Sequence, residues 1–139
     1  MNDLGKPGDG ERHGFEHGGQ RVLLIDSITQ VRAADAGAVV VTGSHGGTSS
    51  GRYAATVRAA LYAFNDAGVG KGGAGIAALA DLDALGIAAV AVGHETAMIG
   101  SAHETWGGMV THANRAAGAL GIDVGATLPD AVAPMGEPS

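Results

Sequence analysis

The sequence predicts an α/β fold, a three-layer sandwich with a small, mostly parallel four- to five-stranded sheet. Four short apolar runs are continuous rather than alternating, and Gly or polar clusters bound them. Continuous runs are typical of strands that are covered on both faces, as in a parallel sheet. Helical patterns separate the runs, and strand–helix–strand repetition with short connections predicts a sheet between helices. The four runs are Val22-Leu23-Leu24-Ile25, Ala38-Val39-Val40-Val41, Leu61-Tyr62-Ala63-Phe64 and Ile87-Ala88-Ala89-Val90-Ala91-Val92.

The connections between the runs predict the helices. Residues 26–37, between the first two runs, could hold a short helix or an extra strand at Ile28-Thr29-Gln30-Val31, so the strand order stays open. One helix face is expected between the second and third runs, at Tyr53, Val57, Ala60 and Leu61. A second is expected between the third and fourth runs, at Ile76, Leu79 and Leu82, ending at Gly86.

The strongest helical pattern follows the fourth run. An apolar stripe with helical spacing predicts one long helix; it consists of Trp106, Met109, Val110, Ala113, Ala117 and Leu120. Ser101 and Glu104 fit a capping box at its start, and Gly121 fits its end.

Length and periodicity predict a single domain. A chain of 139 residues has the usual size of one domain, which we place at residues 21–128. Residues 1–20 are rich in Gly, His and charge without periodicity, and are expected to form a flexible N-terminal tail; residues 129–139 are expected to form a flexible C-terminal tail. Helices rich in small residues are suited to packing on copies of themselves, so a homo-oligomer is expected.

Composition narrows the function classes. The net charge of −6, without any run of Lys or Arg, argues against nucleic acid and anionic membranes as partners. The absence of cysteine removes disulfides and thiolate chemistry. No apolar stretch approaches the roughly 18 residues of a spanning helix, and the first residues lack the apolar region of a secretory signal. We therefore expect a cytoplasmic location.

Polar segments follow each of the four runs. In open α/β sheets, ligands bind beyond the carboxyl ends of the strands, and parallel strands bring these ends to one edge. The segments are Asp26-Ser27, residues 42–51, residues 65–73 and residues 93–96. Their convergence predicts a binding site at that edge.

Each polar residue type in these segments fits a role. His45 fits a general acid/base near neutral pH. Asp66 could set the tautomer of that imidazole or share its proton transfer, and Ser44 could be a hydrogen-bond donor or a nucleophile. Lys71 could hold an anion. The residues expected to bind substrate are Asp26, Ser27, Gly43, Gly46, Gly47, Thr48, Ser49, Asn65 and His94.

We expect neither a metal nor a cofactor. His45 and His94 show no metal-ligand spacing with a second histidine. Residues 47–51 match G-x-S-x-G, but Ser49 lies too far beyond the strand for a nucleophile elbow. Gly70-Lys71 resembles part of a phosphate-binding loop, but Gly72 replaces the required Ser or Thr.

These residues predict a small-molecule enzyme. The leading hypothesis is hydrolysis of an amide or ester that bears a carboxylate or phosphate, because Ser, His, Asp and Lys are the usual groups for this reaction. A cofactor-free lyase or isomerase would use the same groups. The alternative from another class is a non-catalytic anion-binding or assembly subunit.

Overall fold

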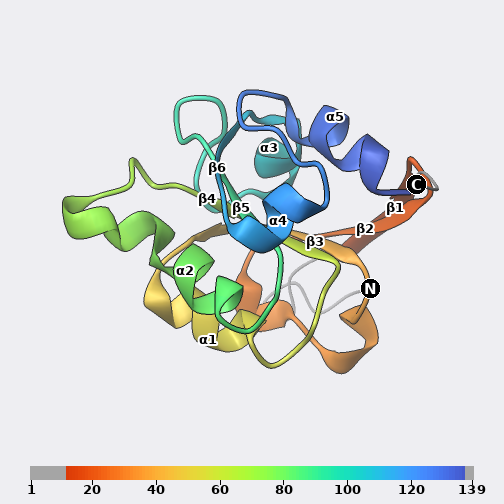
Figure 1. Ribbon diagram of the computed structural model, residues 1–139, viewed down its shortest axis with the longest axis horizontal. Helices are drawn as coiled ribbons and strands as arrows, with labels where there is room; N and C mark the ends of the chain where they lie inside the picture. Colours follow the sequence, from red (N-terminus) through yellow and green to blue (C-terminus); the bar gives the residue numbers. More distant parts are fainter. Residues whose placement is uncertain (1–11, 137–139) are drawn as a thin grey trace, which may run out of the picture.

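A single six-stranded sheet organises the protein (Figure 1), whose computed structural model describes residues 12–136. The strands lie side by side in chain order, and β2 to β5 are parallel, whereas β1 and β6 run antiparallel at the two edges. The α/β class is therefore confirmed, with six strands instead of four or five. Their bounds are β1 Arg12–His17, β2 Gln20–Ile25, β3 Val39–His45, β4 Leu61–Asn65, β5 Ala89–Val92 and β6 Val110–Ala113.

The four apolar runs coincide with the four parallel strands. Successive side chains point to opposite faces of a sheet, and here both faces are covered, so β4 and β5 are buried at every position. Val39 and Val41 pack in one hydrophobic cluster, whereas Val40 packs in a second cluster on the opposite face. This two-sided burial is the physical reason for the continuous apolar pattern.

Helical segments cover the two faces. Those that connect the parallel strands supply the cluster around Val40, and those after β5 supply the cluster around Val39. In Figure 1, α1 and α2 lie below the sheet, and α3 and α5 lie above it. The bounds are α1 Thr48–Ala54, α2 Ala77–Asp83, α3 Ala102–Gly107, α4 Arg115–Ala119 and α5 Leu128–Val132, with short 3-10 turns η1 Ile28–Gln30, η2 Ala33–Asp35, η3 Lys71–Ile76 and η4 Ala133–Gly136.

Of the two helical patterns expected between the second and fourth runs, one holds and one is correct only in part. The α2 pattern holds, since Leu79 and Leu82 are buried and Gly86 follows with a positive φ of 74°. In the preceding pattern Tyr53 is exposed, and Leu61 already belongs to β4. The extra strand considered at residues 28–31 is absent, because Ser27 begins the turn η1 there.

The prediction of one long helix after β5 is wrong. The chain forms α3, then β6, then α4, because residues 107–108 interrupt the helix. Gly108 is extended, with ψ of −179°, and a Cβ on it would lie 2.4 Å from Val92 Cγ1. Trp106 and Ala117 still pack in the same hydrophobic cluster, which explains the regular apolar spacing. Ser101 does cap α3, since its Oγ accepts from Glu104 N at 3.2 Å.

The expected tails are also wrong where the structure describes them. Residues 12–17 form β1, which pairs with β2 through a two-residue turn. Gly18 and Gly19 both have positive φ, as the favoured hairpin turn requires. At the other end, Ala131 and Val132 of α5 are buried in the core. Residues 1–11 and 137–139 lie outside the described part of the chain.

Helix length bears on one further point. Within residues 12–136, the helices are too short and insufficiently apolar to cross a membrane.

Candidate functional site

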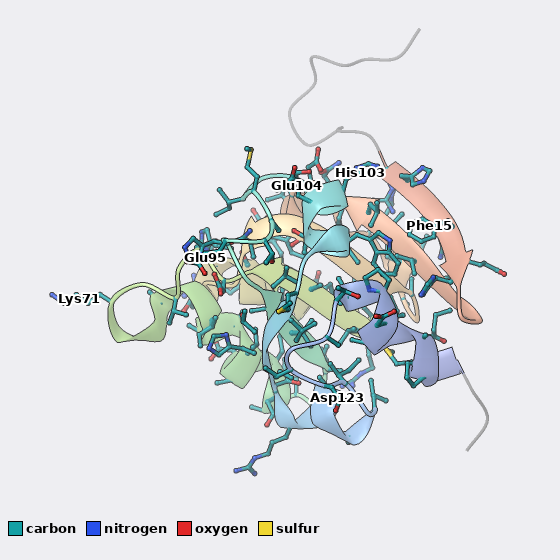
Figure 2. The ribbon with its side chains drawn as sticks, turned by 90° about the horizontal axis from the view of Figure 1, so that it is seen from above. Phe15, Lys71, Glu95, His103, Glu104 and Asp123 are labelled. Carbon is teal, nitrogen blue, oxygen red and sulfur yellow. The ribbon has the colours of Figure 1, made fainter. Side chains whose placement is uncertain are left out.

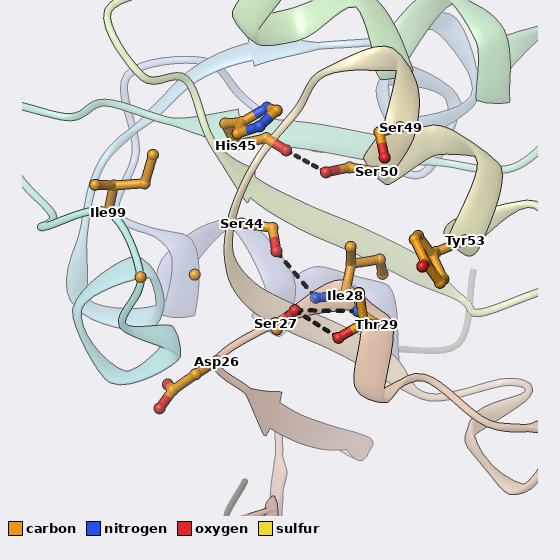
Figure 3. A pocket seen from close by; sticks show the side chains of 12 residues that line it. Asp26, Ser27, Ile28, Thr29, Ser44, His45, Ser49, Ser50, Tyr53 and Ile99 are labelled. Carbon is orange, nitrogen blue, oxygen red and sulfur yellow. Dashed lines mark hydrogen bonds between the residues drawn. The ribbon is translucent and has the colours of Figure 1, made fainter. Parts of the chain in front are cut away.

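A pocket of about 480 Å³ lies beyond the carboxyl ends of β2 and β3 (Figure 3). Its walls come from η1, from α1 on one face of the sheet, and from residues 99–100 that lead to α3 on the other. Part of the predicted site lines it, namely Asp26, Ser27, Gly43, Ser44, His45 and Ser49. The expected convergence of polar residues therefore holds for the ends of β2 and β3.

Glycines at this edge allow close approach of the backbone. A Cβ on Gly43 would lie 2.3 Å from Ser101 N, so only glycine lets residues 100–101 close against β3. Gly100 N donates to Gly43 O at 2.7 Å and fixes that wall. Gly46 N donates to Asn65 O at 3.1 Å, and a Cβ on Gly47 would lie 2.7 Å from the His45 ring. Gly46, Gly47 and the exposed Thr48 do not line the pocket.

Several hydroxyl groups face the pocket. Ser44 Oγ accepts from Ile28 N at 3.0 Å, so its own proton remains available to a ligand. Ser27 Oγ and Thr29 Oγ1 lie 2.8 Å apart and share one hydrogen bond. Ser49 makes no hydrogen bond within residues 12–136. The carboxylate of Asp26 instead accepts from Ala102 N at 2.8 Å and points away from the hydroxyls.

His45 has a defined tautomer. Gly47 N donates to His45 Nδ1 at 3.1 Å, so the neutral ring carries its proton on Nε2. The ring is exposed, and Nε2 makes no hydrogen bond inside the described part of the chain. His45 is therefore suited to donate a hydrogen bond to an oxygen of a ligand.

Asp66 does not set this tautomer, and that expectation is wrong. Its carboxylate, only 5% exposed, instead binds His94 and Thr111. Oδ1 accepts from Gly68 N at 2.8 Å, His94 N at 3.0 Å and His94 Nδ1 at 3.2 Å, and Oδ2 accepts from Thr111 Oγ1 at 3.0 Å. The sequence places Asp66 and His94 at the same edge but gives no sign that they pair.

The environment of Asp66 keeps it ionised. Burial alone would raise its pKa, but the hydrogen bonds from Gly68 N, His94 N, Thr111 and the His94 ring outweigh burial and lower the pKa. His112 extends this cluster, because its Nδ1 lies 3.0 Å from Thr111 Oγ1. One carboxylate thus connects the ends of β4 and β5 to β6.

Asp66 and His94 do not line the pocket, and two other predicted residues also lie away from it. Asn65 is fully buried, and its amide donates to Ala97 O at 2.9 Å while Oδ1 accepts from Ala67 N at 2.8 Å, so it holds the backbone. Lys71 lies at the end of a protruding loop, and its side chain points away from the body (Figure 2). Lys71 therefore cannot reach the pocket in this conformation.

Sequence reasoning missed several residues that the structure places at or beside this edge, among them Ile28, Thr29, Ser50 and Gly100, which line the pocket. Tyr53 and Ile99 line the pocket, and Arg52 lines an adjoining hollow. Thr111 reaches Asp66 from β6. The two consecutive β-branched residues Val110 and Thr111 were the available signal for a strand, but the apolar stripe favoured a helix there.

Comparison of the chain with protein-family models, with curated proteins and with solved structures found no match. Across residues 12–136, no three His, Asp or Glu side chains group closely enough to hold a metal ion. The geometry of the strand ends is therefore the basis on which a function can be proposed.

Asp66→Asn should destabilise the protein near neutral pH, by about 1–3 kcal/mol for hydrogen bonds to a buried charge. Because folding lowers the pKa of Asp66, its charge contributes stability above the unfolded pKa of about 4. That contribution is lost as the pH falls through the lower, folded pKa. Urea unfolding of both proteins from neutral to acidic pH should show the gap between them narrowing below about pH 4. A gap that stays constant to the lowest pH would contradict the assigned role of Asp66.

Proposed function

We propose that the protein is a small-molecule enzyme that hydrolyses an ester or amide bearing a carboxylate or phosphate. The observation that carries the proposal is the pocket of about 480 Å³ beyond β2 and β3, which is lined by serine and threonine residues and by His45. Binding sites for small molecules usually measure roughly 300–1,000 Å³ and hold a few polar groups that fix orientation.

The place of the pocket in the fold supports the proposal. We take the protein as a three-layer sandwich, in which ligands bind in the crevice at the carboxyl ends of the strands. Connections leave this edge toward both faces, with α1 on one and the segment before α3 on the other. The pocket lies between these two connections.

The geometry favours attack by water over attack by a serine. Ile28 N donates to Ser44 Oγ, and Ser50 Oγ donates to the backbone oxygen of His45. No histidine ring among the described residues bonds a serine hydroxyl, so no described serine has an imidazole base beside it. His45 Nε2–H and the Ser44 hydroxyl can instead donate to the carbonyl oxygen that becomes negative during attack. These two side chains therefore act as an oxyanion site in the proposed reaction.

Arg52 is the cation best placed to hold the substrate's anionic group. It lines a hollow of about 380 Å³ together with Ser49 and Tyr53, which also line the main pocket. The two spaces thus adjoin. The side chain of Arg52 makes no ion pair or hydrogen bond within residues 12–136, so its guanidinium is available to a carboxylate or phosphate.

His45→Ala should lower the kcat for hydrolysis of mono-para-nitrophenyl succinate by about 10²–10³, the usual effect of removing one oxyanion donor. Folding should survive, because the exposed ring fills no core volume. His103→Ala is the matched control on an exposed ring of α3 and should hydrolyse the ester at the wild-type rate. Binding of succinate by a wild-type protein that releases no nitrophenol would favour a non-catalytic binding subunit instead.

Arg52→Gln should raise the KM for mono-para-nitrophenyl succinate about tenfold, equivalent to ~1.4 kcal/mol of lost binding. It should leave hydrolysis of the uncharged ester para-nitrophenyl acetate unchanged, because the guanidinium contacts only the anionic group. Lys71→Gln removes the same charge from the protruding loop and should change neither KM. A larger effect for Lys71→Gln than for Arg52→Gln would place the anion on the loop instead.

A further inference from the structure

We infer that His94 is the general base of the proposed hydrolysis and that Asp66 is its positioning residue. The inference rests on the proposed function, which by itself names no base. It follows from the pairing of a half-exposed imidazole with a buried carboxylate at the ends of β4 and β5.

The carboxylate determines which nitrogen of His94 is free. Asp66 is ionised and only accepts hydrogen bonds, so the His94 nitrogen at 3.2 Å, Nδ1, must carry the proton. In the neutral ring, Nε2 then keeps an unshared electron pair. The side chain is 52% exposed, and Nε2 has no partner in the described part of the chain. A carboxylate that holds Nδ1–H and frees Nε2 is the arrangement of the base in acyl-transfer triads.

The surrounding hydrogen bonds hold the pair in place. Both oxygens of Asp66 are engaged, Oδ1 by Gly68 N and His94 N and Oδ2 by the Thr111 hydroxyl. Since Thr111 gives its single proton to Asp66, His112 Nδ1 must donate to Thr111 Oγ1. Four donors thus point toward Asp66, which leaves the carboxylate little freedom to turn.

His45 and His94 have complementary roles because their tautomers are opposite. A backbone N–H occupies Nδ1 of His45 and leaves a donor at Nε2, whereas a carboxylate occupies Nδ1 of His94 and leaves an acceptor there. The two residues flank the end of β4, since His45 pairs with Asn65 and Asp66 binds His94. Two strand spacings separate the backbones of the two strand ends by about 10 Å.

The proposed reaction balances with water as the only co-reactant. His94 Nε2 takes a proton from water while the water oxygen forms a bond to the ester carbonyl carbon. The carbonyl oxygen becomes an oxyanion that accepts a hydrogen bond from His45 Nε2–H. When the tetrahedral intermediate collapses, the bond to the leaving oxygen breaks, and the His94 imidazolium returns its proton to that oxygen. The products are an acid and an alcohol, without a covalent enzyme intermediate.

Long-range proton–nitrogen correlation NMR above neutral pH tests the inference directly, because it reports which ring nitrogen carries the proton. We expect Nδ1–H for His94 and Nε2–H for His45 in the wild type. In Asp66→Asn the Nδ1–H form of His94 should no longer dominate, while the spectrum of the remaining backbone stays native-like. His103→Gln should leave the tautomers of His45 and His94 unchanged.

Kinetics with mono-para-nitrophenyl succinate supply the second readout. His94→Gln should lower kcat by about 10²–10⁴, and Asp66→Asn by up to about 10⁴ if the wrong tautomer dominates. Thr111→Val, which keeps the shape of the side chain, should give a smaller loss in the same direction. Neither the wild type nor Ser44→Ala should show a burst phase of nitrophenol release, because the proposed reaction forms no covalent enzyme intermediate.

The outcomes separate the inference from the proposed function. If His94→Gln hydrolyses the ester within twofold of the wild-type rate, His94 is not the general base. The proposed hydrolase function would be unaffected by this result. Nε2–H as the neutral form of His94 would overturn the inference whatever the activity. If the wild type hydrolyses no ester although His94 carries its proton on Nδ1, the protein is not the proposed hydrolase and His94 is not its general base. The hydrogen bond between Asp66 and His94 would still be correct.

Discussion

The carboxylate of Asp66 is the point on which the arrangement of the strand ends depends. A buried charge is stable only when hydrogen bonds replace the water it has lost. Here those bonds come from Gly68, His94 and Thr111, which belong to separate parts of the chain. The hydrogen bonds to this one carboxylate therefore hold together the loop after β4, the end of β5 and the antiparallel strand β6. The same bonds orient the imidazole of His94, so stability and the proposed chemistry have a common origin.

The pocket depends on a different constraint, the close approach of backbones at glycine. Gly43 lets residues 100–101 close against β3 in space that a Cβ would occupy, and Gly47 leaves room for the ring of His45. The glycines beside the pocket thus form walls and turns. We propose that side chains, Arg52 above all, bind the anion instead of the glycine backbone.

The sequence predicts the four parallel strands and several residues of the pocket. It does not predict which polar side chains at the strand ends bind one another. The four parallel strands are predictable because two-sided burial leaves continuous apolar runs, as in β4. Strand β6 is hidden because Trp106 and Ala117 pack against one face with helical spacing although a strand lies between them. The partner of Asp66 is equally hidden, since a strand-end position predicts an edge of the sheet and not which neighbour a carboxylate will bind. The position of the Lys71 side chain could not be predicted either, because the conformation of the loop determines how far this residue projects from the body.

We propose that the ligand of this protein binds at the carboxyl ends of β2 to β5. Titration of the isotope-labelled protein with succinate, followed by backbone amide shifts, locates the binding site. We expect saturable shifts at residues 43–53 together with residues 66–68 and 93–100, and weaker binding in Arg52→Gln. Shifts confined to the groove between α2 and β6, which is lined by Leu79, His112 and Arg115, would contradict it.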